Sequence, residues 1–173
     1  VCVLKAVKPK KVKLFTGPPS HKEDDAKVVH ELMNNADIRI VSGGTTSQIV
    51  ARELGVEVKS STEIYDKEVP PIAYIQGVDL VTEGVLTLSK TIDRLKSLSK
   101  SLDSDIFKAK DGASQMAKLL YSASHIKLLV GRSLNIANAE SSFQRDLELR
   151  LHVVGELEKI LVKLGKIVTV EYY

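Results

Sequence analysis

Short apolar runs alternate with longer stretches of helical periodicity along almost the whole chain. Five of these runs have the length and composition of buried strands. They lie near residues 12–16, 38–42, 78–82, 126–130 and 167–171. Helical stretches of about ten residues or more separate most of them, which requires crossover connections and therefore parallel strands. The sequence predicts an α/β, Rossmann-like doubly wound fold, with a predominantly parallel sheet and helices on both faces.

Polar residues and glycines mark the ends of three predicted helices. Ser20 and Glu23 have the spacing of a capping box, in which the serine hydroxyl accepts from a helix amide and the glutamate reaches back. Gly55 follows the second helix, where a glycine commonly ends a helix. Asp111 is the predicted N-cap of a later helix.

Other segments are less regular. Residues 56–71 end in two prolines and are predicted to form a loop or lid, followed by a short strand within residues 72–76. Residues 96–105 are predicted to be a polar linker, and residues 135–144 a polar loop. The last helix is predicted from about residue 146 to residue 164.

A length of 173 residues suits one domain, with a core built mostly from aliphatic side chains since the chain has no tryptophan. The first residues, VCVLKAV, have the composition of a strand, and no methionine precedes them. We therefore expect a piece of a longer protein, in which residues 1–11 are a linker or the tail of a preceding domain. Residues 12–173 would form the Rossmann-like domain.

Charge and cysteine content argue against several classes of function. The net charge is +3, and the local run of Lys8, Lys10, Lys11 and Lys13 is expected to be a solvated edge. Nucleic acid is not an expected partner, because aromatic and motif signals of nucleic-acid binding are missing. Cys2 is the only cysteine, which favours a reducing cytoplasm. No membrane partner is expected, because no apolar run approaches the roughly 20 residues of a membrane span and no signal peptide is evident.

The most specific candidate site is the sequence SGGTTS between the second strand and the helix after it. Gly43 and Gly44 would let a ligand approach the backbone, while Thr45, Thr46 and Ser47 bring hydroxyls to the start of the helix. Free amides and the helix dipole together favour an anion such as a carboxylate or phosphate. In the alternative interpretation, the glycines only turn the chain and Thr45 or Thr46 caps the helix.

Three other strands end in a glycine next to polar residues. The carboxyl ends of parallel strands share one edge of a sheet, so these ends are expected to form one pocket with the SGGTTS loop. Glu83 would accept from a ribose or an amine, or act as a general base if desolvated, and Arg132 would clamp an anion. The alternatives are a helix-start carboxylate for Glu83 and a surface cation for Arg132. The expected ligand-binding residues of these ends are Thr16, Gly17, Thr82, Glu83, Gly84, Gly131 and Arg132.

No catalytic residue, metal ligand or cofactor is assigned from the residues themselves. The segment HKEDD at residues 21–25 has metal-binding side chains, but the capping box and the helix dipole account for them. His30, His125 and His152 have no partner motif and are expected to be surface or packing residues. Neither a G-x-S-x-G sequence nor a Cys–His pair supports nucleophilic catalysis.

Several long phrases of the sequence stand in an order that resembles a known family. LFTGPPSHKEDD, VSGGTTSQIVARELG, PPIAYIQGVDLVTEGVLTLSK, KDGAS and LLVGRSLNIAN resemble the region downstream of the phosphatase domain in bacterial serine phosphatases of the sporulation stage II E type. The resemblance covers residues 12–173. Arg132 departs from the family pattern, in which a small or polar residue follows LVG.

The resemblance implies an accessory domain, sensory or regulatory, on a serine/threonine protein phosphatase. The phosphatase is a hydrolase whose two divalent metals are held by aspartates in the upstream domain. Mn or Mg is therefore expected there, and no cofactor is expected in the present chain. Residues 1–7 would be the tail of the last phosphatase strand.

Three functions remain open on this basis. The first is a regulatory domain that binds a small anionic metabolite and biases an attached phosphatase domain. The second is a stand-alone enzyme acting on a phosphorylated or carboxylated small molecule, with Glu83 as base. The third is an interaction module, for example of a homodimer. An anion bound at residues 43–46 would favour the first two, a desolvated Glu83 the second, and a broad exposed apolar surface the third.

Overall fold

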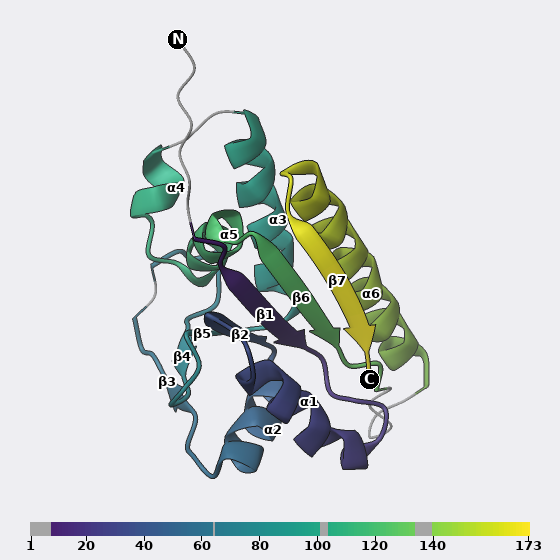
Figure 1. The fold of residues 1–173 in the computed structure, drawn as a ribbon. Coiled ribbons are helices and arrows are strands. Elements are labelled where there is room, and N and C mark those ends of the chain that lie inside the picture. Colours follow the sequence, from purple (N-terminus) through teal and green to yellow (C-terminus); the bar gives the residue numbers. More distant parts are fainter. Residues whose placement is uncertain (1–7, 64, 101–103, 134–139) are drawn as a thin grey trace.

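The strands form one seven-stranded sheet in the order β3-β4-β5-β2-β1-β6-β7 (Figure 1). The computed structural model describes residues 8–63, 65–100, 104–133 and 140–173. The five predicted strands form the parallel part of the sheet, and two short strands add an antiparallel edge, so the predicted fold class is confirmed. The strands are β1 (Lys11–Thr16), β2 (Ile38–Ser42), β3 (Lys59–Ser60), β4 (Ala73–Tyr74), β5 (Leu80–Thr82), β6 (His125–Val130) and β7 (Ile167–Tyr172).

Helices cover the sheet on both faces. Helices α1 and α2 lie on one face, and α3, α5 and α6 lie on the other, with α6 behind β7 in Figure 1. The helices are η1 (Lys22–Asp24), α1 (Asp25–Met33), α2 (Gly44–Leu54), α3 (Val85–Lys100), α4 (Ser104–Lys108), α5 (Gly112–Ser122) and α6 (Glu140–Lys163).

Alternation along the central strands supplies the core of each layer. On β1, Leu14 belongs to the cluster that packs against α3, α5 and α6, while Phe15 belongs to the cluster under α1 and α2. Both side chains are fully buried. Burial of one such side chain stabilises the fold by about 1.5–3 kcal/mol, so the two clusters hold the helices to the sheet.

Two of the predicted helix ends are confirmed and one is wrong. The Asp111 carboxylate accepts from the Ser114 amide at 2.9 Å, and Gly55 ends α2 with a left-handed φ of 66°. No capping box forms at Ser20, whose hydroxyl donates to the Tyr173 carbonyl at 3.3 Å. The reason is that β7 ends beside this loop, so the hydroxyl meets a backbone acceptor from the far end of the sequence.

Helices extend into segments that were predicted to be polar linkers. Helix α3 continues to Lys100 because Leu95 and Leu98 prolong its buried stripe, and α4 begins at Ser104. The remainder of the predicted linker, residues 101–103, lies outside the described residues. Helix α6 begins at Glu140 and so takes in the second half of the predicted polar loop. Residues 1–7 and 134–139 also lie outside the described part, so the predicted phosphatase tail and the rest of the predicted loop are not described.

The segment predicted as a loop or lid contains a strand. Strand β3 pairs antiparallel with β4, and β4 pairs antiparallel with β5. The short strand expected within residues 72–76 is therefore present as β4, whereas β3 was not predicted. The strand expected near residues 78–82 begins later, at Leu80, because the Val78 amide donates to the Ile75 carbonyl in a turn at 3.0 Å.

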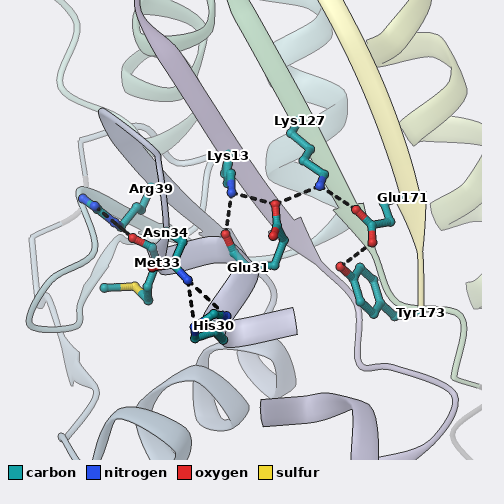
Figure 2. Close-up of polar contacts among 9 residues, drawn as sticks. All are labelled: Lys13, His30, Glu31, Met33, Asn34, Arg39, Lys127, Glu171 and Tyr173. Atoms are coloured by element: carbon teal, nitrogen blue, oxygen red, sulfur yellow. Dashed lines mark hydrogen bonds and ion pairs between the residues drawn. The ribbon is translucent and has the colours of Figure 1, made fainter. Parts of the chain in front are cut away.

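A network of charged side chains crosses three strands on the face that carries α1 (Figure 2). Lys13 is buried and donates to the Glu31 carboxylate at 2.7 Å, so it is not part of a solvated edge. Lys127 contacts Glu31 at 2.8 Å and Glu171 at 2.6 Å, and the Tyr173 hydroxyl donates to Glu171 at 2.8 Å. The network therefore ties α1 to β1, β6 and β7.

Lys127 is predicted to make the free energy of unfolding depend on pH through this network. Its hydrogen bonds lower the pKa of both Glu31 and Glu171, so each carboxylate stabilises the fold above the ordinary glutamate pKa of 4.5. That contribution is lost as the pH falls through the lowered values. We expect Lys127→Met to cost about 1 kcal/mol at neutral pH and to flatten the loss of stability that sets in as the pH falls below the ordinary glutamate pKa of 4.5. Urea denaturation at several pH values measures both effects.

Lys159→Met is the matched control. Lys159 pairs with Glu156 on the exposed side of α6, so its replacement should change stability by less than about 0.5 kcal/mol. Equal pH profiles for Lys127→Met and the parent chain would contradict the prediction.

Candidate functional site

Loops at the carboxyl ends of neighbouring strands diverge at two places in the sheet. After β1 and β2 the chain turns towards α1 and α2 on one face, and after β5 and β6 it turns towards α3 and α6 on the other. The loops therefore separate above the β1–β6 pair and above the β2–β5 pair. Ligands of open α/β sheets bind at places where such loops separate.

The first place is closed by backbone contact between two predicted site glycines. A Cβ added to Gly131 would lie 2.2 Å from the carbonyl oxygens of Gly17 and of Pro18. The Gly131 amide donates to the Thr16 carbonyl at 2.9 Å. Gly131 is therefore required for close packing of the two loops, and it does not line the cleft described next.

The second place is open and forms a cleft of about 230 Å³. Eight predicted site residues line it, which places the ends of β1, β2 and β5 around one space. Ser47, Thr82, Gly131 and Arg132 do not line it. The lining residues are Thr16, Gly17, Pro18, Ser42, Gly43, Gly44, Thr45, Thr46, Glu83, Gly84, Val85 and Arg150.

The N-terminus of α2 faces this cleft with backbone amides. The first hydrogen bond of the helix runs from the Ser47 amide to the Gly43 carbonyl at 2.9 Å, so the amides of residues 44–46 precede it. Gly43 has a φ of 120°, and a Cβ there would approach the Thr46 hydroxyl to 3.0 Å. Gly44, by contrast, has room for a side chain, whose Cβ would lie 4.0 Å from the nearest Glu83 oxygen.

The hydroxyls near the cleft hold loops together. Neither Thr45 nor Thr46 caps α2, so the capping alternative is wrong. The buried Thr46 hydroxyl oxygen accepts from the Gly17 amide at 2.9 Å and joins the β2 loop to the β1 loop. Ser42 and Thr82 donate to the Glu83 carbonyl at 2.8 and 3.0 Å. These groups position the site by fixing its walls.

Glu83 brings a carboxylate to the mouth of the cleft. Its side chain is exposed, and its carbonyl is fixed by the two hydroxyls from β2 and β5. An exposed carboxylate lacks the desolvation that a general base needs at neutral pH. The geometry therefore suits an acceptor for a ligand cation or hydroxyl better than a base.

Arg150 is the cation of the cleft, and it was not among the residues predicted from the sequence. Its Nη1 donates to the Gly131 carbonyl at 3.3 Å, and a Cβ on Gly17 would lie only 2.7 Å from the same nitrogen. Burial lowers the pKa of Arg150, partly opposed by Asp146 one turn earlier. One feature of the sequence could have identified Arg150. It stands three residues after Leu147 and four before Val154, on the apolar stripe of α6.

Arg132, the cation predicted to lie here, lies outside the cleft. Its guanidinium sits over the Tyr172 ring, 5.7 Å from the ring centroid, and its side chain is exposed. Its amide donates to the Tyr173 carbonyl at 2.9 Å. These contacts match the surface-cation alternative.

A second pocket of about 180 Å³ adjoins the cleft between α2 and the β3–β4 edge. Gly44 and Glu83 line both spaces, and two predicted residues, Ser47 and Thr82, line this one. Its walls are aliphatic and polar in about equal measure, because Ser47, Gln48, Ser60, Thr82 and Glu83 bring polar groups to it. The remaining lining residues are Val58, Pro71, Ile72, Ala73 and Val81.

Neither a metal-holding cluster nor a membrane-spanning helix is present in the part of the chain that the structure describes. Within residues 8–63, 65–100, 104–133 and 140–173, no group of three or more His, Cys, Asp or Glu side chains is arranged to hold a metal ion. Among the helices of those same ranges, none is both long enough and apolar enough to cross a bilayer.

Thr46 is predicted to stabilise the two loops that form the cleft. Thr46→Val keeps the shape of the side chain but leaves the Gly17 amide without its acceptor, which should cost about 1–3 kcal/mol. Thr45→Val is the matched control, since Thr45 is exposed, and should change stability by less than about 0.5 kcal/mol. Urea denaturation of the two variants measures the difference, and equal midpoints would show that the hydrogen bond contributes nothing.

Comparisons with known proteins add no assignment to this geometry. The chain matches no protein-family model, no curated protein and no solved structure. The resemblance to phosphatase accessory domains therefore remains an expectation from the quoted phrases. The chemistry of the cleft is the basis on which its function is inferred.

Proposed function

We propose that this domain binds a small anionic metabolite in the cleft between the β2 and β5 loops. On the basis of the family resemblance described above, it would act in the cytoplasm as a regulatory domain of an attached serine/threonine phosphatase of the sporulation stage II E type. The observation that carries the proposal is a partly buried guanidinium, that of Arg150, lining the same cleft as the N-terminal amides of α2.

The cation of the cleft has donors to spare. A guanidinium has five N–H donors, and within the described residues Arg150 uses one of them, on the Gly131 carbonyl. A carboxylate or phosphate in the cleft would accept from this group and from the amides of Gly44 and Thr45. Hydrogen bonds to charged groups contribute about 1.5–3 kcal/mol, and the helix dipole adds about 0.3–1 kcal/mol.

The position of the cleft in the chain supports a regulatory role. Strand β1 begins beside the segment expected to join the phosphatase domain and ends at Thr16 in the cleft wall. A ligand held between the β1, β2 and β5 loops and α6 would contact elements from both faces of the sheet. Its binding would therefore affect β1, the strand that leads to this junction. The alternative of a stand-alone enzyme has less support, since Glu83 is exposed.

Arg150 is predicted to be needed for anion binding. Inorganic phosphate added to the isotope-labelled chain should shift the amide resonances of Gly44 and Thr45. Arg150→Gln should weaken this binding at least tenfold, which corresponds to about 1.4 kcal/mol. Arg145→Gln is the matched control, because Arg145 is an exposed residue of the same helix and does not line the cleft. Equal phosphate affinities of the two variants would rule out the proposed site.

Gly44 is predicted to keep the amides of α2 accessible. Gly44→Val should fold, because the backbone there has no positive φ and space is open for the new side chain. The added methyl groups would cover the amides and abolish the phosphate-induced shifts. The thermal midpoint without ligand reports the fold, and unchanged phosphate binding by a folded variant would show that the loop is only a turn.

A further inference from the structure

The anion-binding cleft also contains a negative charge of its own. The Glu83 carboxylate lines the same space as Arg150 and the start of α2, and no cation among the described residues pairs with it. A ligand carrying only a carboxylate or phosphate would be attracted by Arg150 and repelled by Glu83. The cleft is therefore complementary to a ligand that carries both signs of charge.

We propose that the ligand is a zwitterion of the α-amino-acid type with an apolar side chain; this inference rests on the anion site proposed above. The ligand carboxylate would lie between Arg150 and the amides of Gly44 and Thr45. Its ammonium group would face the Glu83 carboxylate. One carbon separates these two groups in an α-amino acid, which suits a cleft whose opposite charges face one small space.

Glu83 is placed to distinguish an ammonium group from a hydroxyl. A hydroxyl donates a hydrogen bond but leaves the repulsion between Glu83 and the bound anion uncompensated. An ammonium group supplies both a donor and the opposite charge. Hydrogen bonds to charged groups are worth about 1.5–3 kcal/mol, which corresponds to a preference of about tenfold or more for the zwitterion over its deaminated analogue.

The second pocket provides the place for an apolar side chain. It meets the cleft at Gly44 and Glu83, where the ligand carboxylate and ammonium are proposed to bind. Val58, Ile72 and Val81 contribute aliphatic walls. Its volume of about 180 Å³ is the share of about six water molecules in the liquid, enough for the four-carbon side chain of leucine.

The experiment compares four probes by calorimetry and by amide shifts of Gly44 and Thr45. Leucine carries all three groups. In 4-methylpentanoate the ammonium is missing, in 3-methylbutylamine the carboxylate is missing, and in glycine the side chain is missing. We expect leucine to bind at least about tenfold more tightly than each of the other three.

Glu83→Gln separates the role of the ammonium contact from general binding. This variant should bind leucine about tenfold more weakly than the parent and 4-methylpentanoate more tightly, because the repulsion is removed while the shape is kept. Glu148→Gln, at an exposed position of α6, is the control and should leave both affinities unchanged.

The outcomes distinguish this inference from the proposed anion site. If phosphate shifts the Gly44 and Thr45 amides in an Arg150-dependent way but leucine binds no better than 4-methylpentanoate, the zwitterion inference is wrong and the anion site stands. Equal loss of leucine and 4-methylpentanoate binding in Glu83→Gln would also overturn it. If neither phosphate nor any of the four probes binds to the folded chain, both proposals fail.

Discussion

Close contact between the backbones of Gly17 and Gly131 sets the geometry of the carboxyl edge of the sheet. A side chain on Gly131 would collide with two carbonyl oxygens of the β1 loop, and the Gly131 amide is bonded to the Thr16 carbonyl. The loops that lead to α1 and α6 therefore leave the sheet from touching positions. The loops of the sheet diverge at two places. The contact between Gly17 and Gly131 closes the first, above the β1–β6 pair, and the cleft lies at the second, between the β2 and β5 loops.

The same contact determines where the cation of the cleft lies. Arg150 comes from α6, and its guanidinium packs over Gly17 within reach of the Gly131 carbonyl. The missing side chain of Gly17 therefore leaves room for the Arg150 side chain, where a ligand was expected. Arg150 forms part of the cleft wall. The Thr46 hydroxyl fixes the β2 loop to the Gly17 amide, so the cation and the wall of the cleft both depend on contacts with the backbone of Gly17 and Gly131.

The order of elements was predictable because strand and helix signals are local in the sequence. The N-cap at Asp111 and the glycine that ends α2, Gly55, also depend only on near neighbours. The capping box at Ser20 failed because its partner, the Tyr173 carbonyl, lies 153 residues away. Arg150 was missed for a related reason, since only the strand order places α6 beside the first loop. Its position on an apolar helix stripe was visible, but the sequence does not show what that stripe faces.

The charged network on β6 and β7 affects how molecules of this protein meet one another. Ile167 and Thr169 are exposed on β7, a six-residue strand at the edge of the sheet. Flat sheet surfaces next to open edges are places where protein chains associate and aggregate. A second sheet laid on this face would strip water from Lys127 and Glu171, and desolvating such ions is unfavourable. The network is thus expected to disfavour close packing of a second chain against this face.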